Sequence, residues 1–157
     1  MKKKKFTKIR ENITEVEYQK LLTYLNGKEN LTTNTRNNLR RTFILLYFTG
    51  MRVNEVKQLK VKDINTIFEK EELIIVTHKT RKERKLFFSK EAIKQIKKHF
   101  VFNDNSKNED YIITTKGNTS KTPNSSTFIA KVNSFIQEVL GHRYSSHSFR
   151  AGIITDM

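Results

Sequence analysis

The sequence predicts a mainly α-helical domain that carries a small antiparallel β-sheet. Several segments repeat apolar residues with the period of a helix, whereas one short region switches to runs of β-branched and aromatic residues. A chain of 157 residues, of which 36% are hydrophobic, can bury one core, and it contains no internal repeat or dividing linker. We therefore expect a basic tail over residues 1–12 and one domain over residues 13–157.

The first predicted helix begins at a capping box. Thr14 and Glu17 have the spacing at which side chains and backbone amides bond reciprocally, and Asn26-Gly27 is a typical helix end. Between them, the apolar residues that recur on one face are Tyr18, Leu21, Leu22 and Leu25.

A second helix, from Thr33 to Thr49, is predicted to form the centre of the domain. Its residues 43–48 are apolar on every side, which is typical of a helix surrounded by the rest of a small protein. Gly50 suits its C-terminal cap, where a left-handed residue is needed.

A third helix is expected from Arg52 to Lys60. The residues that face inward on it are Val53, Val56 and Leu59. Because Arg52 directly follows the central helix, its backbone is fixed against the core. An arginine held in this way is pre-organised to bind a phosphate.

The apolar pattern then changes from that of helices to that of strands. Residues 73–77 and 85–88 are short runs of strand-favouring side chains, and the basic segment from His78 to Arg84 joins them as a hairpin tip. A further strand is expected over Ile64 to Phe68, and another short one over Tyr111 to Ile113.

The C-terminal half is predicted to hold three helices. Ser89 caps the first of them. The second begins at Thr122-Pro123, with the proline at the first helical position, and ends at Gly141. Ser145 or Ser146 begins the last. The inward residues of the second are Phe128, Val132, Phe135, Ile136 and Val139.

The charge of the chain points to a polyanionic partner. Its 31 Lys and Arg residues outnumber 16 Asp and Glu residues, which gives a formal net charge of +15. Such a charge opposes compaction, and nucleic acid would relieve it. An anionic membrane surface is the second interpretation, although no apolar run approaches the roughly 20 residues that a span needs. The lysine run at residues 2–5 is a solvated tail or touches DNA phosphates, and it lacks the apolar segment of a secretory signal.

The composition excludes thiol chemistry. Because the chain has no cysteine, it has no disulfide, no thiol nucleophile and no thiolate zinc site. The spacing of His78, His99 and His142 follows no ligand pattern, so we expect no metal site.

Two arginines and a histidine have the chemistry of a phosphodiester site. His147 and Arg150 lie three residues apart on one face of the last predicted helix, where they can hold the same anion. With Arg52 they supply two forked cations for the non-bridging oxygens and an imidazole that binds the phosphate or moves a proton. Lys79 is the candidate donor of a proton to the departing 5′ oxygen. Glu55 is expected to hydrogen-bond His147 and hold its ring in place.

Each of these residues also has a plainer interpretation. Arg52 and Glu55 can form an ordinary pair on a helix surface, and His147 and Arg150 can lie on a solvated terminal helix. Lys79 is one of several cations at the hairpin tip, where most charges only touch solvent or phosphates.

Three of these segments resemble the motifs of one enzyme family. Residues 49–55, Thr-Gly-Met-Arg-Val-Asn-Glu, followed by Leu59 and Asp63-Ile64, resemble the first arginine box of the tyrosine recombinases, which include phage integrases and Xer-type proteins. Residues 79–84 resemble the catalytic-lysine turn of that family, and His147-x-x-Arg150 resembles its second box. Order and spacing agree from about Ile13 to the end, so the resemblance covers nearly the whole chain.

The resemblance implies a fold, a mechanism and a set of site residues. The fold is the DNA breaking–rejoining catalytic domain, and the mechanism is cleavage through a 3′-phosphotyrosine without metal or nucleotide. The implied catalytic residues are Arg52, Lys79, His147 and Arg150, with Glu55 behind them. The residues implied to contact DNA are Arg81, Lys82 and Arg84.

The resemblance also implies partners and a location. The implied partners are duplex DNA and further recombinase protomers, and no membrane or small-molecule cofactor is implied. The location is the cytoplasm for a bacterial or phage-encoded protein, or an organelle.

Parts of the family pattern do not occur in the sequence. The family places a further His or Trp and then the nucleophilic tyrosine a few tens of residues beyond the second box, and the sequence stops at Met157. The five tyrosines all precede Arg150 and are Tyr18, Tyr24, Tyr47, Tyr111 and Tyr144. The helical domain that usually clamps DNA from the N-terminal side is also missing, and His78 stands where glycine is common.

We therefore expect a C-terminally truncated catalytic domain that binds DNA, has no nucleophile of its own and does not cleave DNA alone. One alternative is a non-catalytic DNA-binding module or regulator derived from an integrase. Another is a generic basic RNA-binding protein, for which substitution of Arg52 and Arg150 would matter no more than that of other cations.

Overall fold

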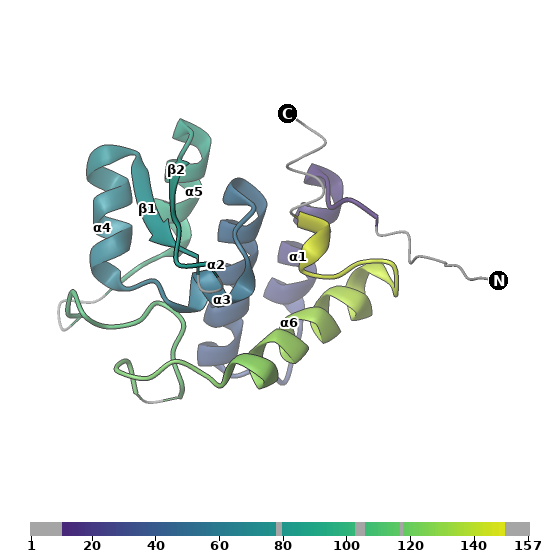
Figure 1. The fold of residues 1–157 in the computed structure, drawn as a ribbon. Helices are drawn as coiled ribbons and strands as arrows, with labels where there is room; N and C mark the ends of the chain where they lie inside the picture. Colours follow the sequence, from purple (N-terminus) through teal and green to yellow (C-terminus); the bar gives the residue numbers. More distant parts are fainter. Residues whose placement is uncertain (1–10, 78–79, 103–105, 117, 150–157) are drawn as a thin grey trace.

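Helices make up most of the computed structural model, which describes residues 11–77, 80–102, 106–116 and 118–149 (Figure 1). The elements in chain order are α1 (Glu15–Gly27), α2 (Thr33–Thr49), α3 (Val53–Lys57), α4 (Val61–Lys70), β1 (Glu72–Val76), β2 (Glu83–Phe87), α5 (Lys90–His99) and α6 (Ser125–Leu140). The predicted fold class, mainly helical with a small antiparallel sheet, is confirmed. In the described part of the chain, every helix is too short or too polar to cross a membrane.

Helix α2 lies at the centre of the core and packs against α1, α3 and α5. Its residues 43–46 are fully buried, as their all-round apolar pattern predicts. Tyr47 and Phe48 are half-buried and contact the ring of Tyr18 on α1, with the two tyrosine rings stacked at 4.0 Å. The central helix therefore provides the rigid body on which the following segments are mounted.

The ends of the first two helices follow the predicted chemistry. The Glu17 carboxylate accepts a hydrogen bond from the Thr14 backbone N–H at 2.9 Å, as in a capping box. Gly50 closes α2 in the left-handed region with φ 71°, and its N–H donates to the Leu46 carbonyl. This sharp end turns the chain directly into α3.

The prediction of a strand over Ile64 to Phe68 is wrong, because these residues lie in helix α4. The Asp63 carboxylate accepts a hydrogen bond from the Lys60 backbone N–H at 2.9 Å and starts the helix. Val61, Ile64 and Ile67 are then buried on one face. Helical periodicity therefore overrides the preference of isoleucine and phenylalanine for strands. The same extended cap at Lys60 makes α3 end at Lys57, earlier than predicted.

The segment 111–113 is also not a strand in the described structure, where Tyr111 makes only an isolated bridge with Lys60. Its backbone is bonded to other elements: the Ile112 N–H donates to the Leu59 carbonyl, and the Ile112 carbonyl accepts from Arg41 of α2. Both isoleucines are buried, so their apolar run reflects packing against helices rather than membership of a sheet.

Helix α6 starts two residues after the predicted proline. Asn124 is its N-cap, and its side chain accepts a hydrogen bond from the Thr127 N–H at 3.2 Å. Pro123 therefore precedes the cap instead of occupying the first helical position. The predicted inward residues are buried, apart from Val139, which is partly buried, and Gly141 ends the helix with φ 107°.

Strands β1 and β2 form an antiparallel hairpin in which Leu73 pairs with Leu86 and Val76 pairs with Glu83. Leu73, Ile75 and Leu86 bury one face, while Ile74 and Phe87 remain exposed on the other. The tip is closed by the Thr77 N–H, which donates to the Lys82 carbonyl at 2.8 Å. The hairpin is therefore as predicted, with strand bounds shifted by one or two residues. Of the predicted tip, residues 80–82 lie between the strands, residues 83 and 84 belong to β2, and residues 78 and 79 lie outside the described residues.

Candidate functional site

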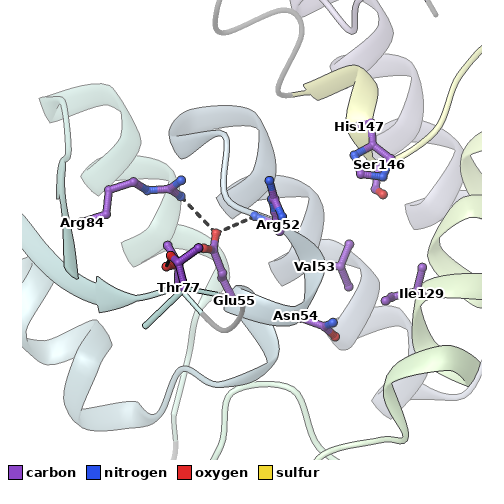
Figure 2. A pocket seen from close by; sticks show the side chains of 10 residues that line it. Arg52, Val53, Asn54, Glu55, Thr77, Arg84, Ile129, Ser146 and His147 are labelled. Carbon is purple, nitrogen blue, oxygen red and sulfur yellow. Dashed lines mark hydrogen bonds and ion pairs between the residues drawn. The ribbon is translucent and has the colours of Figure 1, made fainter. Parts of the chain in front are cut away.

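A pocket of about 490 Å³ lies where three distant segments of the chain meet (Figure 2). One side is the start of α3, the second is the end of the hairpin and the third is the segment that holds His147 (Figure 2). The lining residues are Arg52, Val53, Asn54, Glu55, Thr77, Thr80, Arg84, Ile129, Ser146 and His147.

Arg52 is held at the N-cap of α3 with its side chain exposed. Its position follows from Gly50 and from Thr49, whose hydroxyl accepts a hydrogen bond from the Met51 N–H at 3.0 Å. Met51 is fully buried, so the backbone on the N-terminal side of Arg52 is anchored in the core. The exposed side chain of Arg52 lines the pocket.

Glu55 is the buried charge of the site, with only 4% of its surface exposed. Its carboxylate accepts one hydrogen bond from the Arg52 backbone N–H at 2.9 Å and another from the Arg84 guanidinium at 3.0 Å. A buried carboxylate needs such partners to offset its lost hydration. The expectation was that Glu55 braces His147, whereas the structure shows it tying the backbone of Arg52 to β2 (Figure 2).

Arg84 was expected to contact DNA, and the structure shows it paired with Glu55 inside the pocket. Its side chain is one-third exposed, and its Nε is buried without a partner in the described part of the chain. Arg84 therefore forms an ion pair with Glu55, and its Nε–H group remains as a hydrogen-bond donor at the pocket wall. The other two cations expected to contact DNA, Arg81 and Lys82, are exposed at the hairpin tip.

The imidazole of His147 is exposed and lines the pocket from a short helical turn over residues 147–149. Ser145 begins this turn, since its hydroxyl accepts a hydrogen bond from the His147 N–H at 3.2 Å. The Ser146 N–H donates to Asn133 of α6 at 2.8 Å. Phe149 is buried and stacks with Phe43 of α2 at a ring distance of 6.2 Å. The position of the imidazole is thereby tied to the core.

The N-terminal residues support the same turn. The Ile13 N–H donates to the Ser148 carbonyl at 3.3 Å, and the Glu11 N–H donates to the Arg143 carbonyl at 3.1 Å. The chain that leads into α1 thus runs beside the segment that carries His147.

Two predicted catalytic residues, Lys79 and Arg150, lie outside the described residues. Their nearest described neighbours are placed at the site. Thr77 and Thr80, whose hydroxyls lie 2.7 Å apart, both line the pocket, and Phe149 adjoins His147.

None of the five tyrosines, all of which are described, lines this pocket. Tyr18 is buried in the core, where desolvation raises the pKa of its hydroxyl far above the usual value. Burial also raises the pKa of the Tyr144 hydroxyl. A tyrosine nucleophile needs to reach the phosphate, and none of the five lies at this pocket.

Several lining residues were not predicted from the sequence. Asn54 lies within the first box without a predicted role, and Ile129 and Ser146 lie outside the three motifs; they reach the pocket because α3, α6 and the 145–149 segment converge. Among the described residues, no group of three His, Asp or Glu side chains is placed to hold a metal ion. An exposed arginine, an imidazole and the spare donor of Arg84 instead suit an anion with several acceptor oxygens.

Comparisons with known proteins agree with this fold. The model of the phage integrase family matches residues 11–157. The crystal structure of XerA recombinase aligns with a TM-score of 0.65 at 16% identity, over 99% of this chain and 52% of that one. No curated protein sequence matched.

Two further solved structures contain DNA. The XerH site-specific recombinase in a post-cleavage complex with its palindromic difH substrate gives a TM-score of 0.63 at 21% identity, over 94% of this chain and 42% of that one. The Tn1549 transposon integrase in complex with a circular intermediate DNA gives a TM-score of 0.64 at 14% identity, over 99% of this chain and 55% of that one. The chain therefore spans about half the length of the solved proteins that share its fold.

Proposed function

Because the chain belongs to the phage integrase family of tyrosine recombinases, we propose that it binds duplex DNA and activates one phosphodiester for strand cleavage and rejoining. The observation that carries the proposal is the convergence of three motifs in one pocket. Arg52 and Glu55 come from the first box, Thr80 comes from the lysine turn, which Thr77 precedes, and His147 comes from the second box.

The proposed roles follow from the charge that develops during phosphoryl transfer. Arg52 and Arg150 hold the non-bridging oxygens of the scissile phosphate, where charge accumulates as the attacking oxygen approaches. Lys79 donates a proton to the 5′ oxygen as its bond to phosphorus breaks. His147 bonds the phosphate and assists proton transfer. Glu55 keeps Arg52 in place through the bond to its backbone N–H.

In this proposal the attacking tyrosine comes from outside residues 1–157, because no tyrosine of the sequence lines the pocket. Attack of its hydroxyl forms a bond to the 3′ phosphate and releases the 5′ hydroxyl. Rejoining reverses the step and regenerates the tyrosine.

The proposal assigns residues 13–157 to the catalytic domain and residues 1–12 to a basic tail that contacts DNA or solvent. Further recombinase protomers on the same DNA complete the assembly, and the reaction takes place where the chromosome or phage DNA is, in the cytoplasm or an organelle. The solved XerH complexes hold their difH substrate before and after cleavage, which supports duplex DNA as the partner.

A second candidate function is a non-catalytic DNA-binding module. It is favoured by one observation, the absence of any tyrosine from the pocket wall. Both candidates predict DNA binding, and they differ in whether a strand is cut once a suitable tyrosine is supplied.

The test uses a nicked duplex from which the cleaved fragment diffuses away, so that a covalent intermediate accumulates. Residues 1–157 alone should bind this DNA in a salt-sensitive manner and give no covalent adduct. Arg52→Ala should weaken binding more than Arg81→Ala, because only Arg52 lies in the phosphate pocket. Equal losses for the two variants would refute the assigned site. An adduct would place the nucleophile within the chain, and mapping it would begin at Tyr144.

A further inference from the structure

We propose that a second pocket, beside Lys57, binds one phosphate of the DNA backbone other than the phosphate at Arg52. The inference rests on the proposed function, since it takes duplex DNA as the ligand of this face. The pocket has a volume of about 200 Å³ and is lined by Asn54, Lys57, Gln58, Tyr111, Thr122 and Ser125. Asn54 also lines the first pocket, so the two sites are neighbours.

Lys57 is a buried cation whose charge is not balanced by a carboxylate. Only 6% of its surface is exposed, and its Nζ donates a hydrogen bond to the Ser125 hydroxyl at 2.8 Å. No acidic side chain pairs with it among the residues that the structure describes. Burial lowers the pKa of its ammonium group, which shows that the surroundings do not favour the charge. An ammonium has three donors, so two remain for a ligand.

The partner of Lys57 increases this imbalance. Ser125 is the first residue of α6, a helix of 16 residues whose N-terminus carries a partial positive charge. A lysine would normally be stabilised at the opposite end of a helix. Two positive features therefore meet at one point, and an anion there would stabilise both.

Two further polar atoms face the pocket without partners. The side-chain oxygens of Asn54 and Thr122 are buried, and neither has a hydrogen-bond partner among the described residues. Buried polar groups are normally paired, so such atoms mark a place where a ligand or water completes the structure. The threonine hydroxyl can donate, and the asparagine amide can turn to present its NH₂ group. None of the six lining residues is acidic, so these donors suit an anion rather than a cation.

The position of the pocket favours a DNA phosphate over a free one. Gln58 and Ser125 are exposed and open it to solvent, and Asn54 joins it to the pocket where the scissile phosphate is proposed to lie. A duplex presents phosphates on a continuous backbone, so a strand held at Arg52 offers further phosphates nearby. The formal net charge of +15 favours such a polyanion.

The experiment measures the affinity of the whole chain for a duplex at salt concentrations from about 50 to 200 mM. Lys57→Met keeps an unbranched side chain one atom shorter than lysine and removes the charge, and an apolar residue at a buried position is not expected to unfold the domain. We expect the salt slope of the variant to fall by about 0.9 and its affinity to fall about tenfold. Lys94→Met, which changes an exposed lysine of α5 that lines neither pocket, is the matched control.

A second variant separates the pocket from general charge. Thr122→Val keeps the shape and deletes only the hydroxyl, so it should weaken DNA binding without changing the salt slope. Inorganic phosphate, titrated alone, tests the free ion. If it binds at Lys57 while Lys57→Met leaves the DNA salt slope unchanged, the ligand is free phosphate and the DNA assignment fails.

The two proposals fail in different ways. If the wild-type chain binds DNA and the slope of Lys57→Met equals that of wild type or of Lys94→Met, the second phosphate site is refuted and the proposed function stands. If the wild-type chain does not bind DNA, both are refuted.

Discussion

The carboxylate of Glu55 accepts a hydrogen bond from the guanidinium of Arg84 at 3.0 Å and thereby joins the start of α3 to strand β2. The same carboxylate bonds the backbone N–H of Arg52. The pair thus determines how the hairpin sits relative to the arginine that is proposed to hold the scissile phosphate.

Removal of Arg84 should therefore destabilise the domain. Arg84→Ala leaves the Glu55 carboxylate buried with a single partner, which should lower the free energy of unfolding by about 2 kcal/mol. The loss is smaller than for a fully buried ion pair because the Arg84 side chain is one-third exposed. Urea denaturation measures the change. Lys82→Ala, at an exposed position of the same hairpin, should be nearly neutral, and an equally small effect of Arg84→Ala would contradict the role of the pair.

Gly50 is predicted to be required for its backbone conformation. Its φ of 71° is strained for any residue with a Cβ, so Gly50→Ala should cost about 1–2 kcal/mol and shift the adjacent Arg52. Gly27→Ala is the control, because a Cβ at Gly27 would meet open space and its φ is not positive. That variant should be as stable as wild type or slightly more stable. A comparison of their thermal unfolding decides the point.

Asn38 is predicted to hold the loop that follows Ile113. Its buried side chain donates to the Thr114 carbonyl at 2.8 Å and accepts from the Thr114 N–H at 3.2 Å. Asn38→Ala leaves the Thr114 N–H without its partner, whereas the Thr114 carbonyl keeps a hydrogen bond from the Asn34 amide at 3.0 Å. The loss of the buried donor's partner should lower the free energy of unfolding by about 2 kcal/mol in chemical denaturation. Asn65→Ala removes an exposed amide whose contact with Asn108 is at 3.5 Å, and it should change stability little. Equal effects of the two changes would show that the Asn38 bonds are replaced by water.

The stability of the domain should depend on pH through Glu109. Hydrogen bonds from Lys62 and then from Lys60 lower the pKa of this carboxyl from its usual value of 4.5 to about 2. A lowered pKa in the folded state contributes stability that is complete above about pH 5 and is lost as the pH falls towards 2.

The stability difference between wild type and Glu109→Gln should follow that course and shrink in high salt, because the carboxylate is exposed. Glu69→Gln, at an exposed position that forms no ion pair in the described part of the chain, should show no such dependence. A titration of Glu109 by NMR near its usual pKa would contradict the prediction.

Local patterns in the sequence were sufficient for the first two helices, where a cap and an apolar face were both recognised. The bounds of α2 and the cap at Gly50 are as predicted because the burial of the apolar residues and the left-handed conformation of the glycine place the helix end at the same point. The strand predicted over Ile64 to Phe68 failed because strand preference was weighed above the buried face of α4.

Contacts between distant segments were harder to predict. The motifs indicated that Arg52 and His147 share a site, and both line the same pocket. The pairing of Glu55 with Arg84 joins residues far apart in the sequence and depends on the register of the hairpin, which no local pattern reveals.

The backbone bonds from Glu11 and Ile13 to the segment that carries His147 have a practical consequence. Through these bonds the residues before α1 support the segment that forms one wall of the site, although neither Glu11 nor Ile13 lines the pocket. A protease cut after Ile13, or a bulky fusion placed just before it, would loosen the imidazole while the core around α2 stayed folded. Changes just before the first helix should therefore alter the position of His147, which lies far away in the sequence but next to these residues in the fold.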